Sequence, residues 1–582
     1  MDGFFNRILI VDLAAQSFRA EPVADEVYEK YLGGKGLGTW LLLRENPAGV
    51  DPLSPGNALI FAVGPCTDVR VHGSARYGVF TKSPLTGLYC ESYSGATVAD
   101  HISRTGYDAI VLKGASAEPV WLEISDRDVK FHPAQDLWGK STFETEDALR
   151  ERVGKHGIVV IGPGGERQVR FAIIANDYWR CAGRSGAGAV MGAKKVKGIV
   201  FLGEAKRKVA DSEVLARHFR DLTERAKTDP GVANYKKYGT MMMIKVANQA
   251  NVFPTRYWSA GRRENWEEIS GDALLAKFKV TPHACPRCFM ACGKITEVKA
   301  GRHQGLKIEG PEYETTFAFG GLCLVKDLEE IAYLNDLCDR LGLDTITVGN
   351  LAGFAMLASE QGKITEKIPF GDVDMIAQLI QDIAERKGLG AVLADGIREA
   401  ARTWDMEDEA VHVKGLEPSG YDPRPLKGMG LAYAVSDRGA CHLRATMYKP
   451  ELAGLIAPSA VAGKAEMFID YEDRATLFDT LILCRFFRDL NQWDELKTII
   501  LGTTGMDLDQ AGLARIAAGI MDLTRSFNLW EGATAADDRL PQRLYKIKIT
   551  PDNQDITPAE LRTMVIEYYR LRGWDEQGRP KS

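Results

Sequence analysis

Three cysteines close together are the residues in this chain with the clearest chemical meaning. Cys285, Cys288 and Cys292 follow the spacing C-x2-C-x3-C. Thiolates at this spacing can bind three corners of a cubane iron–sulfur cluster, and a distant cysteine must then supply the fourth bond. Cys484 is our preferred fourth ligand and Cys441 is the alternative. The spacing therefore favours one 4Fe–4S cluster.

Two alternatives to an iron–sulfur cluster stay open for these cysteines. Structural zinc usually takes two C-x2-C pairs or a mixed set of Cys and His. The chain has no second C-x2-C pair, but His283 could serve as a ligand. Unbound core cysteines are the second alternative, although three thiols in eight residues are a rare coincidence. Ten cysteines in 582 residues are too few for a disulfide scaffold.

The elements that position these residues change in type along the chain. Apolar runs at 8–12, 58–63 and 158–161 predict short buried strands, and no long repeat stands out. From about residue 325 helix signals dominate. We expect helices over 328–341, from a cap at Thr345 to a stop at Gly362, and from the capping box at Thr557 to Arg572. The fold class is therefore α+β and multidomain, with a boundary near residue 208.

The composition is that of an ordinary globular protein, with 45% hydrophobic and 26% charged residues. The 73 basic and 79 acidic residues give a formal net charge of −6, which offers no general reason to bind nucleic acid or an anionic membrane. No targeting segment is evident at the N-terminus, and every apolar run is far shorter than the ~18 residues that span a bilayer. We expect a cytoplasmic protein.

Several longer motifs, in a fixed order, make the chain recognisable. They are LGGKGL at 32–37, TKSPLTG at 81–87, AGRSGAGAVMG at 182–192, GPEYE at 310–314, LGLDT at 341–345, YDPR at 421–424, RGACH at 438–442 and YYRLRGW at 568–574. With the cysteine group, this pattern resembles the aldehyde:ferredoxin oxidoreductase family over nearly the whole chain. Members of that family carry tungsten between two pterins, together with one 4Fe–4S cluster.

The resemblance implies three domains. A β-rich bispterin-binding domain would span 1–208. A helical domain over 209–418 would carry the cluster cysteines and a first pterin-binding segment, and a second helical domain over 419–582 would carry the other segment and the fourth cysteine. The resemblance also implies that Cys285, Cys288, Cys292 and Cys484 hold the cluster.

Two short segments, 339–344 and 479–484, share a pattern that could bind a pterin. Each places an aspartate near a helix end, with a polar residue five positions later. A carboxylate can accept two hydrogen bonds from the edge of a pterin. Helix capping with a solvated charge accounts for the same pattern. The family resemblance assigns pterin binding to Asp339, Asp344, Thr345, Asp479 and Leu483.

The phosphate ends of the pterins need cations and backbone N–H groups. The glycine-rich segment 183–188 can supply both, and its spacing does not fit the nicotinamide-binding pattern G-x-G-x-x-G. The resemblance places a further set of residues at the cofactor, namely Arg76, Tyr93, Gly95, Arg180, Cys181, Gly183, Arg184 and Arg444. It also implies a magnesium ion between the phosphates, held partly by backbone carbonyls. Tyr93 stands where one family member has asparagine.

Glu314 and His442 occupy the catalytic positions of the family. A buried glutamate should have a raised pKa and could exchange a proton near neutral pH. His442 could donate a hydrogen bond to the carbonyl oxygen of a substrate, and Tyr313 is a plausible second donor. A histidine in isolation is more often a core residue, but the residues that flank His442 match the family.

The chain departs from the family at a few positions. Tyr333 and Asp336 replace an E-x-x-H pair that holds a single iron ion in some members, so we expect no such site. Ile482 replaces a glycine before the fourth cysteine. Arg485 replaces an apolar residue after it, and could mark a docking site for an acidic ferredoxin.

The function that the resemblance implies is oxidation of aldehydes to carboxylic acids with water. Electrons would pass from tungsten through the cluster to a ferredoxin or a small ferredoxin-like subunit, with or without a link to a flavin subunit. One alternative is a reductive catalytic subunit that acts on carboxylic acids or an aromatic thioester. Another is a non-catalytic iron–sulfur or zinc-stabilised scaffold. No ligand in the sequence distinguishes tungsten from molybdenum.

Overall fold

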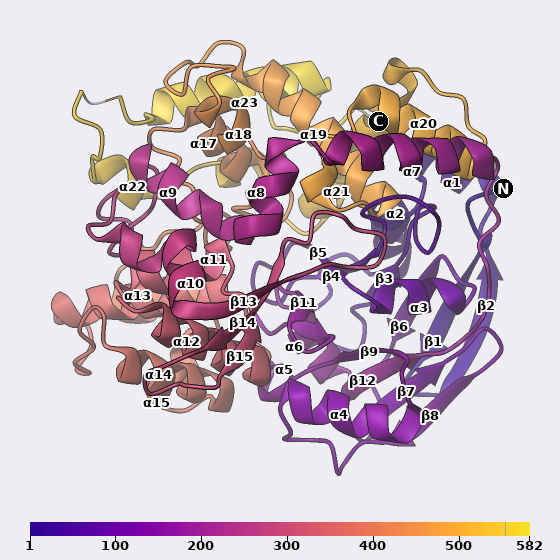
Figure 1. The fold of residues 1–582 in the computed structure, drawn as a ribbon, viewed down its shortest axis with the longest axis horizontal. Helices are drawn as coiled ribbons and strands as arrows, with labels where there is room; N and C mark the ends of the chain where they lie inside the picture. The colour runs from indigo at the N-terminus through magenta and orange to yellow at the C-terminus, as the bar shows by residue number, and fades with distance from the viewer. Residues whose placement is uncertain (553, 582) are drawn as a thin grey trace.

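The structure is a computed structural model and describes residues 1–552 and 554–581. Two β-sheets form the N-terminal third of the chain, and helices from residue 212 onward lie beside and above them (Figure 1). The predicted α+β class is confirmed. In this described part, no helix is long and apolar enough to cross a membrane.

The first sheet has six strands in the order β2-β1-β6-β3-β4-β5. β1 and β2 form an antiparallel hairpin, β1 pairs in parallel with β6, and the remaining neighbours are antiparallel. Its strands are β1 (Arg7–Asp12), β2 (Ser17–Pro22), β3 (Leu59–Ala62), β4 (Arg76–Lys82), β5 (Tyr89–Gly95) and β6 (Ala109–Lys113). The predicted strands at 8–12 and 58–63 are thus β1 and β3.

The second sheet repeats this plan in the next hundred residues. Its order is β11-β10-β9-β12-β7-β8, with a β7–β8 hairpin, a parallel β7–β12 pair and antiparallel pairs elsewhere. Its strands are β7 (Val120–Ile124), β8 (Val129–Pro133), β9 (Gly157–Val160), β10 (Ile174–Asn176), β11 (Arg180–Ala182) and β12 (Val196–Phe201). The sequence shows no long repeat, yet the topology is repeated strand for strand.

Each sheet also carries helices at matching points of the chain. α2 (Gly34–Glu45) and α4 (Thr142–Val153) precede the third strand of their sheets, and α3 (Val98–Arg104) and α6 (Ala187–Ala193) precede the sixth. After the third strand each sheet continues with the same residue triplet pattern, Val63-Gly64-Pro65 in one and Ile161-Gly162-Pro163 in the other. α1 (Asp25–Tyr31) and α5 (Pro163–Glu166) have no counterpart.

A three-stranded antiparallel sheet crosses in front of both larger sheets (Figure 1). It consists of β13 (Phe278–His283), β14 (Gly293–Val298) and β15 (Lys307–Glu309). The connection from β13 to β14 contains the three clustered cysteines. Two residues of this connection, Arg287 and Ala291, have left-handed backbone with φ of 55° and 44°.

The helices after residue 208 form the remainder of the molecule. They are α7 (Ser212–Ala226), α8 (Pro230–Tyr238), α9 (Met242–Gln249), α10 (Gly271–Lys277), α11 (Tyr313–Thr316), α12 (Leu328–Leu341), α13 (Thr345–Glu360), α14 (Val373–Glu385), α15 (Gly388–Leu393), α16 (Ile397–Trp404), α17 (Lys427–Val435), α18 (Tyr448–Leu452), α19 (Lys464–Leu481), α20 (Trp493–Thr504), α21 (Gln510–Trp530), α22 (Gln542–Lys546) and α23 (Pro558–Arg572). α7 packs against α20 across the chain. The division at 208, 418 and 582 stays a prediction.

The predicted helix ends agree closely with the structure. α12 ends before Gly342, whose φ of 76° and ψ of 46° are left-handed. α23 begins with the capping box of Thr557 and Glu560 and ends before Gly573. One detail differs: α13 is capped by Asp344, which accepts from Ile346 N, and Thr345 is its first residue. Asp344 is better placed because its short carboxylate reaches the free N–H groups of the first turn.

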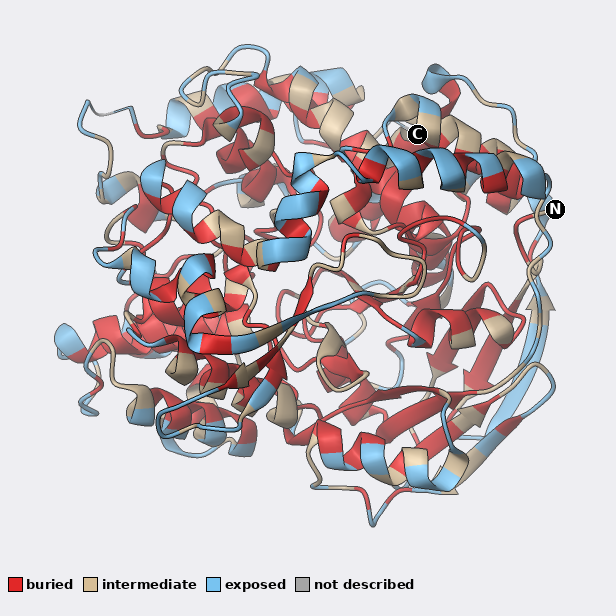
Figure 2. Cartoon of the chain, viewed as in Figure 1, coloured by how far each residue is buried: buried red, intermediate tan, exposed pale blue. Residues whose placement is uncertain are grey.

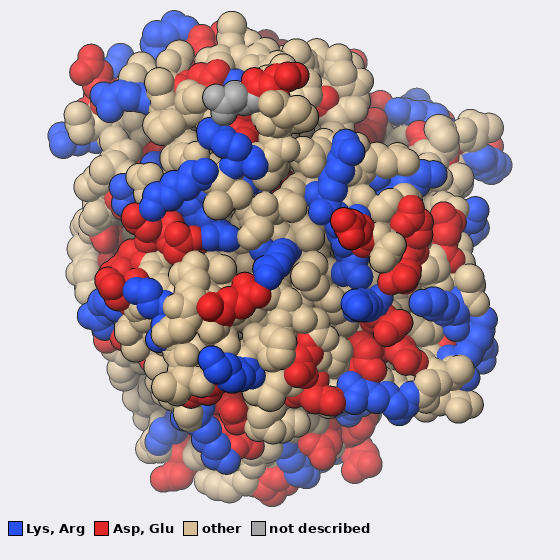
Figure 3. All heavy atoms as spheres, turned by 90° about the vertical axis from the view of Figure 1, so that its left-hand side faces the viewer, with Lys and Arg blue, Asp and Glu red and all other residues tan. Residues whose placement is uncertain are grey.

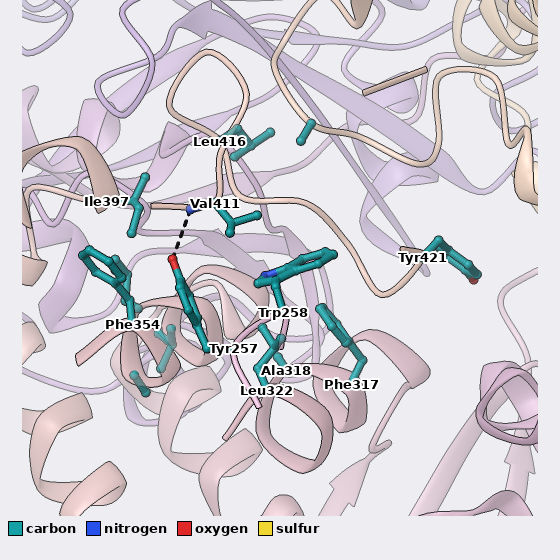
Figure 4. Packing of buried hydrophobic residues seen from close by; sticks show 14 of the residues in the cluster. Tyr257, Trp258, Phe317, Ala318, Leu322, Phe354, Ile397, Val411, Leu416 and Tyr421 are labelled. Carbon is teal, nitrogen blue, oxygen red and sulfur yellow. Dashed lines mark hydrogen bonds between the residues drawn. The ribbon is translucent and has the colours of Figure 1, made fainter. Parts of the chain in front are cut away.

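Buried residues fill the central strands of the two sheets and the inner faces of the helices, while the edge strand β2 and the outer faces of α4 and α7 are exposed (Figure 2). A large apolar core lies among the helices, with Trp258 beside Phe317 at a ring distance of 5.9 Å (Figure 4). Phe317 begins a π-helical segment, Phe317–Leu322, that directly follows α11. On the face shown in Figure 3, acidic and basic side chains alternate without a large area of one sign.

Candidate active site

The four predicted cluster cysteines surround one cavity. Cys285, Cys288, Cys292 and Cys484 all line a space of about 280 Å³. The first three reach it from the β13–β14 connection, and Cys484 follows α19 and donates from its backbone N to Gly73 O at 2.9 Å. The chain therefore brings the distant cysteine to the group that spacing alone had identified.

The rival fourth ligand and the rival metal ligand lie elsewhere. Cys441 Sγ accepts from Arg438 Nη2 at 2.9 Å and does not line this cavity. His283 does not line it either, and its Nδ1 lies 3.1 Å from Glu309 Oε1. Within the described residues, no three His, Cys, Asp or Glu side chains are close enough to hold a single metal ion.

The cysteine-bearing connection is fixed to the first sheet by Arg287. Its Nη1 donates to Asp100 Oδ2 at 3.0 Å and its Nη2 donates to Asp100 Oδ1 at 2.5 Å, so the pair is bidentate. The backbone O of Arg287 lies 2.9 Å from His72 Nδ1. Burial and the neighbouring Cys484 raise the pKa of Cys288 to about 12. Such thiols ionise readily only when a metal centre compensates the charge.

A second cavity of about 440 Å³ adjoins the first. The two share four lining residues, which are Arg76, Tyr93, Glu312 and Phe486. The second cavity is lined by all three predicted catalytic residues, Tyr313, Glu314 and His442. An acid–base group and a four-thiol cavity are thus neighbours in space, although they come from distant segments of the chain.

Glu314 lies in the first turn of α11, whose continuation is buried in the helical core. Its Oε2 accepts from Gly420 N at 2.9 Å. Its Oε1 has no hydrogen-bond partner in the described structure and lies 3.6 Å from His442 Nε2. Burial raises the pKa of Glu314 to about 8. This carboxyl group can therefore gain or lose a proton close to neutral pH.

His442 has the opposite shift. Burial, followed by the nearby guanidinium of Arg438, lowers its pKa well below the ordinary value. The imidazole is therefore neutral at physiological pH and has one N–H to donate. Tyr313 lies beside the pair, but its hydroxyl already donates to Gly420 O. Its predicted role as a donor to substrate would require an exchange of that partner.

The predicted cofactor residues fall into two groups. One group lines one or both cavities: Arg76, Tyr93, Gly95, Arg180, Cys181, Gly183, Arg184, Arg444 and Asp479. The other group lines neither of the two: Asp339, Asp344, Thr345 and Leu483. Asp344 nevertheless binds a residue that lines the second cavity, because Arg184 Nε donates to Asp344 Oδ2 at 3.1 Å.

The remaining members of the second group lie behind the cavity walls. Asp339 accepts from Asn335 Nδ2 at 2.7 Å, and burial raises its pKa well above the ordinary value. Thr345 Oγ1 lies 2.9 Å from Thr315 Oγ1. Leu483 is buried in the core that joins α19 to the first sheet. Any contact of these residues with a pterin stays a prediction.

Asp479 belongs to a buried charge network that the sequence did not reveal. It accepts from Arg444 Nη1 at 2.7 Å and from Arg485 Nε at 3.1 Å. Arg444 also pairs with Glu91, which is 0% exposed and accepts from Lys35 Nζ at 3.2 Å. Lys35 is the lysine of the LGGKGL motif at 32–37. We used that motif only as evidence of family resemblance and did not identify its lysine as part of a charge network.

The network overturns the predicted docking role of Arg485. Its side chain is 8% exposed and forms an ion pair with Asp479 Oδ2 at 2.5 Å. A partner protein cannot reach a guanidinium that is enclosed and already bound to a carboxylate. Arg485 instead helps to neutralise the carboxylate behind the cavity.

Unpartnered polar atoms mark the walls of the two cavities. Within the residues that the structure describes, the Nε atoms of Arg180, Arg438 and Arg444 have no hydrogen-bond partner. The Oε1 atom of Glu314 also lacks one. Buried polar atoms are rarely left unpaired in a native protein. These walls therefore fit a polar group with both donors and acceptors, such as a pterin with its phosphates.

Tyr93 does not present its side chain to such a group. Its hydroxyl donates to Glu91 Oε2 at 2.6 Å, and its backbone O accepts from Arg76 Nη2 at 3.4 Å. Only the carbonyl could bind a magnesium ion, and nothing further in the described residues supports that ion.

Comparisons with known proteins cover the whole chain. A profile described as "Aldehyde ferredoxin oxidoreductase, N-terminal domain" matches residues 8–203, and one described as "Aldehyde ferredoxin oxidoreductase, domains 2 & 3" matches residues 217–582. Tungsten-containing aldehyde ferredoxin oxidoreductase from Pyrococcus abyssi is 36% identical over 100% of this chain and 98% of its own length. The protein of that name from Pyrococcus furiosus is 35% identical over the same shares.

More distant relatives differ in what their names describe. The WOR-like subunit of an aliphatic sulfonate oxidoreductase from Pyrococcus furiosus is 27% identical over 100% of this chain and 96% of that protein. The solved active-site complex BamBC of benzoyl coenzyme A reductase has a TM-score of 0.86 and 22% identity, over 100% of this chain and 96% of that one. That likeness shows a shared fold. With both profiles and the full-length relatives in agreement, this chain belongs to the aldehyde ferredoxin oxidoreductase family and is an oxidoreductase of that family.

Proposed function

We propose that the chain oxidises aldehydes to carboxylic acids with water and passes the electrons through a 4Fe–4S cluster to a ferredoxin or a ferredoxin-like subunit. The observation that carries this proposal is the Glu314–His442 pair, which lies in a cavity that adjoins the four-cysteine cavity. A scaffold subunit would have no use for a buried carboxyl group with a pKa of about 8 and one oxygen that accepts no hydrogen bond in the described structure. Full-length likeness to tungsten-containing aldehyde oxidoreductases supports the same reaction.

The four thiols would hold the cluster. Their arrangement around about 280 Å³ of space favours a multi-iron cluster over a single zinc ion, because four ligands of one ion must converge on a point. A tungsten bis-pterin would be held by Arg184, Arg444 and Asp479 at the cavity walls, with Asp339 and Asp344 behind them. When bound, that cofactor would supply a two-electron redox centre. The magnesium ion and any link to a flavin subunit stay predictions.

The residues of this chain would then perform three tasks. The neutral His442 would donate its N–H to the aldehyde oxygen, which polarises the carbonyl group for attack by water. The Glu314 carboxylate would accept a proton from that water at Oε1, the oxygen that has no other partner. The surrounding wall would exclude bulk water. The overall reaction turns an aldehyde and water into a carboxylic acid, two protons and two electrons.

The direct test combines metal analysis with an aldehyde assay. The purified holoenzyme should contain tungsten and iron and should reduce a viologen dye when an aldehyde is added. Glu314→Gln should keep both metals while turnover falls ~10²–10⁴-fold, the usual cost of losing one positioned acid–base group. Glu466→Gln makes the same chemical change at an exposed site of α19 and should change nothing.

The pH profile adds a second readout of the same residue. Only the ionised carboxylate can accept a proton, and the pKa of Glu314 is raised to about 8. Wild-type turnover should therefore rise as pH increases through about 8 and level off above it. The Glu314→Gln profile should lack this rise. Near-normal turnover in the fully metallated Glu314→Gln variant would remove Glu314 from the mechanism. A wild-type protein that contains no tungsten, or that does not reduce the dye when an aldehyde is added, would refute the proposed function.

A further inference from the structure

The catalytic cavity contains one buried cation that the proposed chemistry does not use. Arg488 lines this cavity and is 8% exposed. Its Nη1 donates to Arg485 O at 2.7 Å. Its Nε and Nη2 have no hydrogen-bond partner in the described part of the chain. A buried charge without compensating groups is costly, so two unused donors on one guanidinium indicate a missing acceptor.

The other buried arginines of this cavity have partners, although those of Arg438 are Glu91 O and Cys441 Sγ and include no carboxylate. Arg184 pairs with Asp344, and both Arg444 and Arg485 pair with Asp479. Arg488 forms no ion pair with any residue that the structure describes. The carboxylate next to it in sequence, Asp489, also lines this cavity and pairs with Lys449, and Arg488 and Lys449 together lower the pKa of Asp489 against the effect of burial. Arg488 therefore has a charged neighbour but no direct ion pair, and two of its donors have no partner in the described residues.

Aromatic side chains surround this charge. The phenol groups of Tyr235 and Tyr448 lie near the Arg488 guanidinium, and Tyr235 packs on Phe486 at a ring distance of 4.6 Å. Tyr448 also connects this region to the catalytic pair, because its ring lies 6.4 Å from that of His442. A tyrosine ring therefore lies near both the catalytic pair and the Arg488 guanidinium.

We propose that Arg488 binds a carboxylate at the end of the substrate remote from the aldehyde, so that the cavity selects aldehydes that carry such a group. This inference rests on the proposed function. Arginine suits the task because its planar donors match the two oxygens of a carboxylate. The Tyr448 ring, which lies 6.4 Å from that of His442 and near Arg488, suits an aromatic ring between the two functional groups.

The test compares two substrates of similar shape and different charge. 4-Formylbenzoate carries a carboxylate opposite its aldehyde, and 4-methylbenzaldehyde carries a methyl group there. Arg488→Met removes the charge and keeps most of the side-chain length. It should lower kcat/KM for 4-formylbenzoate by roughly 30-fold or more, the usual cost of truncating one partner of a buried charge pair. The value for 4-methylbenzaldehyde should change less than about threefold, since that substrate makes no charged contact.

The separate changes in KM and kcat distinguish a loss of substrate binding from a disrupted active site. Arg488 holds substrate in the ground state and the transition state alike, so KM should rise while kcat stays nearly constant. Arg488→Lys should recover part of the selectivity because it restores a charge without the fork. Arg402→Met removes an exposed arginine paired with Glu399 outside this cavity and should not alter the substrate ratio. Tungsten and iron contents should be equal in all variants.

A binding measurement keeps the inference testable without turnover. Calorimetric titration with 4-methylbenzoate should show binding to the wild-type holoenzyme and at least tenfold weaker binding to Arg488→Met. An equal fall in kcat/KM for both aldehydes, or equal affinity of both proteins for 4-methylbenzoate, would overturn the role of Arg488. If neither aldehyde is oxidised by the wild type, the proposed function fails, and the titration alone decides whether Arg488 binds carboxylates.

Discussion

Two turns in this molecule have the same backbone plan and different electrostatics. α12 ends at Leu341 and is followed by Gly342, and α19 ends at Leu481 and is followed by Ile482. Gly342 and Ile482 are both left-handed, with φ of 76° and 61° and ψ of 46° and 50°. Each turn places an aspartate three residues before this position, which is Asp339 in one case and Asp479 in the other.

Each turn also contacts one of the two repeated sheets at the same point. A β-carbon on Gly162, after β9, would come within 2.6 Å of Leu341 O. A β-carbon on Gly64, after β3, would come within 2.6 Å of Leu481 O. Glycine is required at both positions because the backbone of each turn lies against it. The two repeated sheets thus hold two similar turns, an arrangement that would suit a cofactor with two similar pterins.

The charges around the two aspartates differ. Asp479 accepts from two guanidinium groups, those of Arg444 and Arg485. Asp339 accepts from the neutral amide of Asn335, and burial together with Asp336 raises its pKa well above the ordinary value. The turn that leads into Cys484 is therefore a fixed ion-pair network, and the other turn carries a carboxyl group that favours its neutral form. The two sheets therefore share a topology, but the charges around the aspartates of their two turns differ.

The largest expected effect comes from the residue five positions after each aspartate. Cys484→Ala should remove a cluster ligand, so iron content should fall and dye reduction should drop more than about 100-fold, because even changes outside the metal ligands cost 10–100-fold. Asp344→Ala at the matching position should keep the iron and lose the α13 cap and the ion pair with Arg184. Iron analysis and the cluster absorption spectrum measure both.

Cys441→Ala is the control for the first comparison. Cys441 contacts Arg438 and lies outside the four-thiol cavity, so this variant should retain its iron. Loss of the cluster in Cys441→Ala, with an intact cluster in Cys484→Ala, would show that the wrong cysteine had been chosen.

An intermediate effect is expected from the two aspartates themselves. Asp479→Asn leaves two buried guanidinium groups without their shared carboxylate and should lower the free energy of unfolding by about 3–5 kcal/mol. Asp339→Asn leaves no guanidinium group without a partner, because Asp339 accepts from the neutral amide of Asn335, and should cost less than about 1 kcal/mol. Chemical denaturation of the two variants at pH 7 measures the difference. Equal losses would mean that the two turns are electrostatically alike after all.

The sequence predicted those parts of this arrangement that depend on local patterns. The spacing of Cys285, Cys288 and Cys292 identified one wall of the cluster cavity, and the stop at Gly342 identified one of the two turns. The network of Lys35, Glu91 and Arg444 was not predictable, because its members are far apart in the chain and each looks ordinary in isolation. The repeated sheets were missed for a related reason. Strand order is determined by long-range pairing, and the two halves share little sequence beyond a Gly-Pro pair.

Ile482 shows why the second turn could not be predicted from local sequence. A β-branched residue is strongly disfavoured in the left-handed region, so its presence argues against a turn of the Gly342 type. The structure nevertheless places it there, with its side chain buried and its Cδ1 close to Gly34 at the start of α2. Burial of its side chain contributes about 1.5–3 kcal/mol, which is enough to offset the backbone cost.

A substitution at Gly342 sharpens this last contrast. Gly342→Ala should cost about 1–2 kcal/mol from the left-handed backbone, without the burial that compensates Ile482. The new β-carbon would also lie 2.9 Å from Gly162 N, in a backbone that cannot easily move because it follows the buried strand β9. Gly49→Ala is the matched control, since Gly49 has a φ of 70° and no atom within 4 Å of a new β-carbon. Thermal unfolding of both variants separates the two costs: Gly49→Ala reports the backbone strain, and the excess in Gly342→Ala reports the close approach to the second sheet. If the two variants lose equal stability, the turn at Gly342 does not depend on its contact with Gly162. The two sheets would then share a topology without sharing a role in holding the two turns.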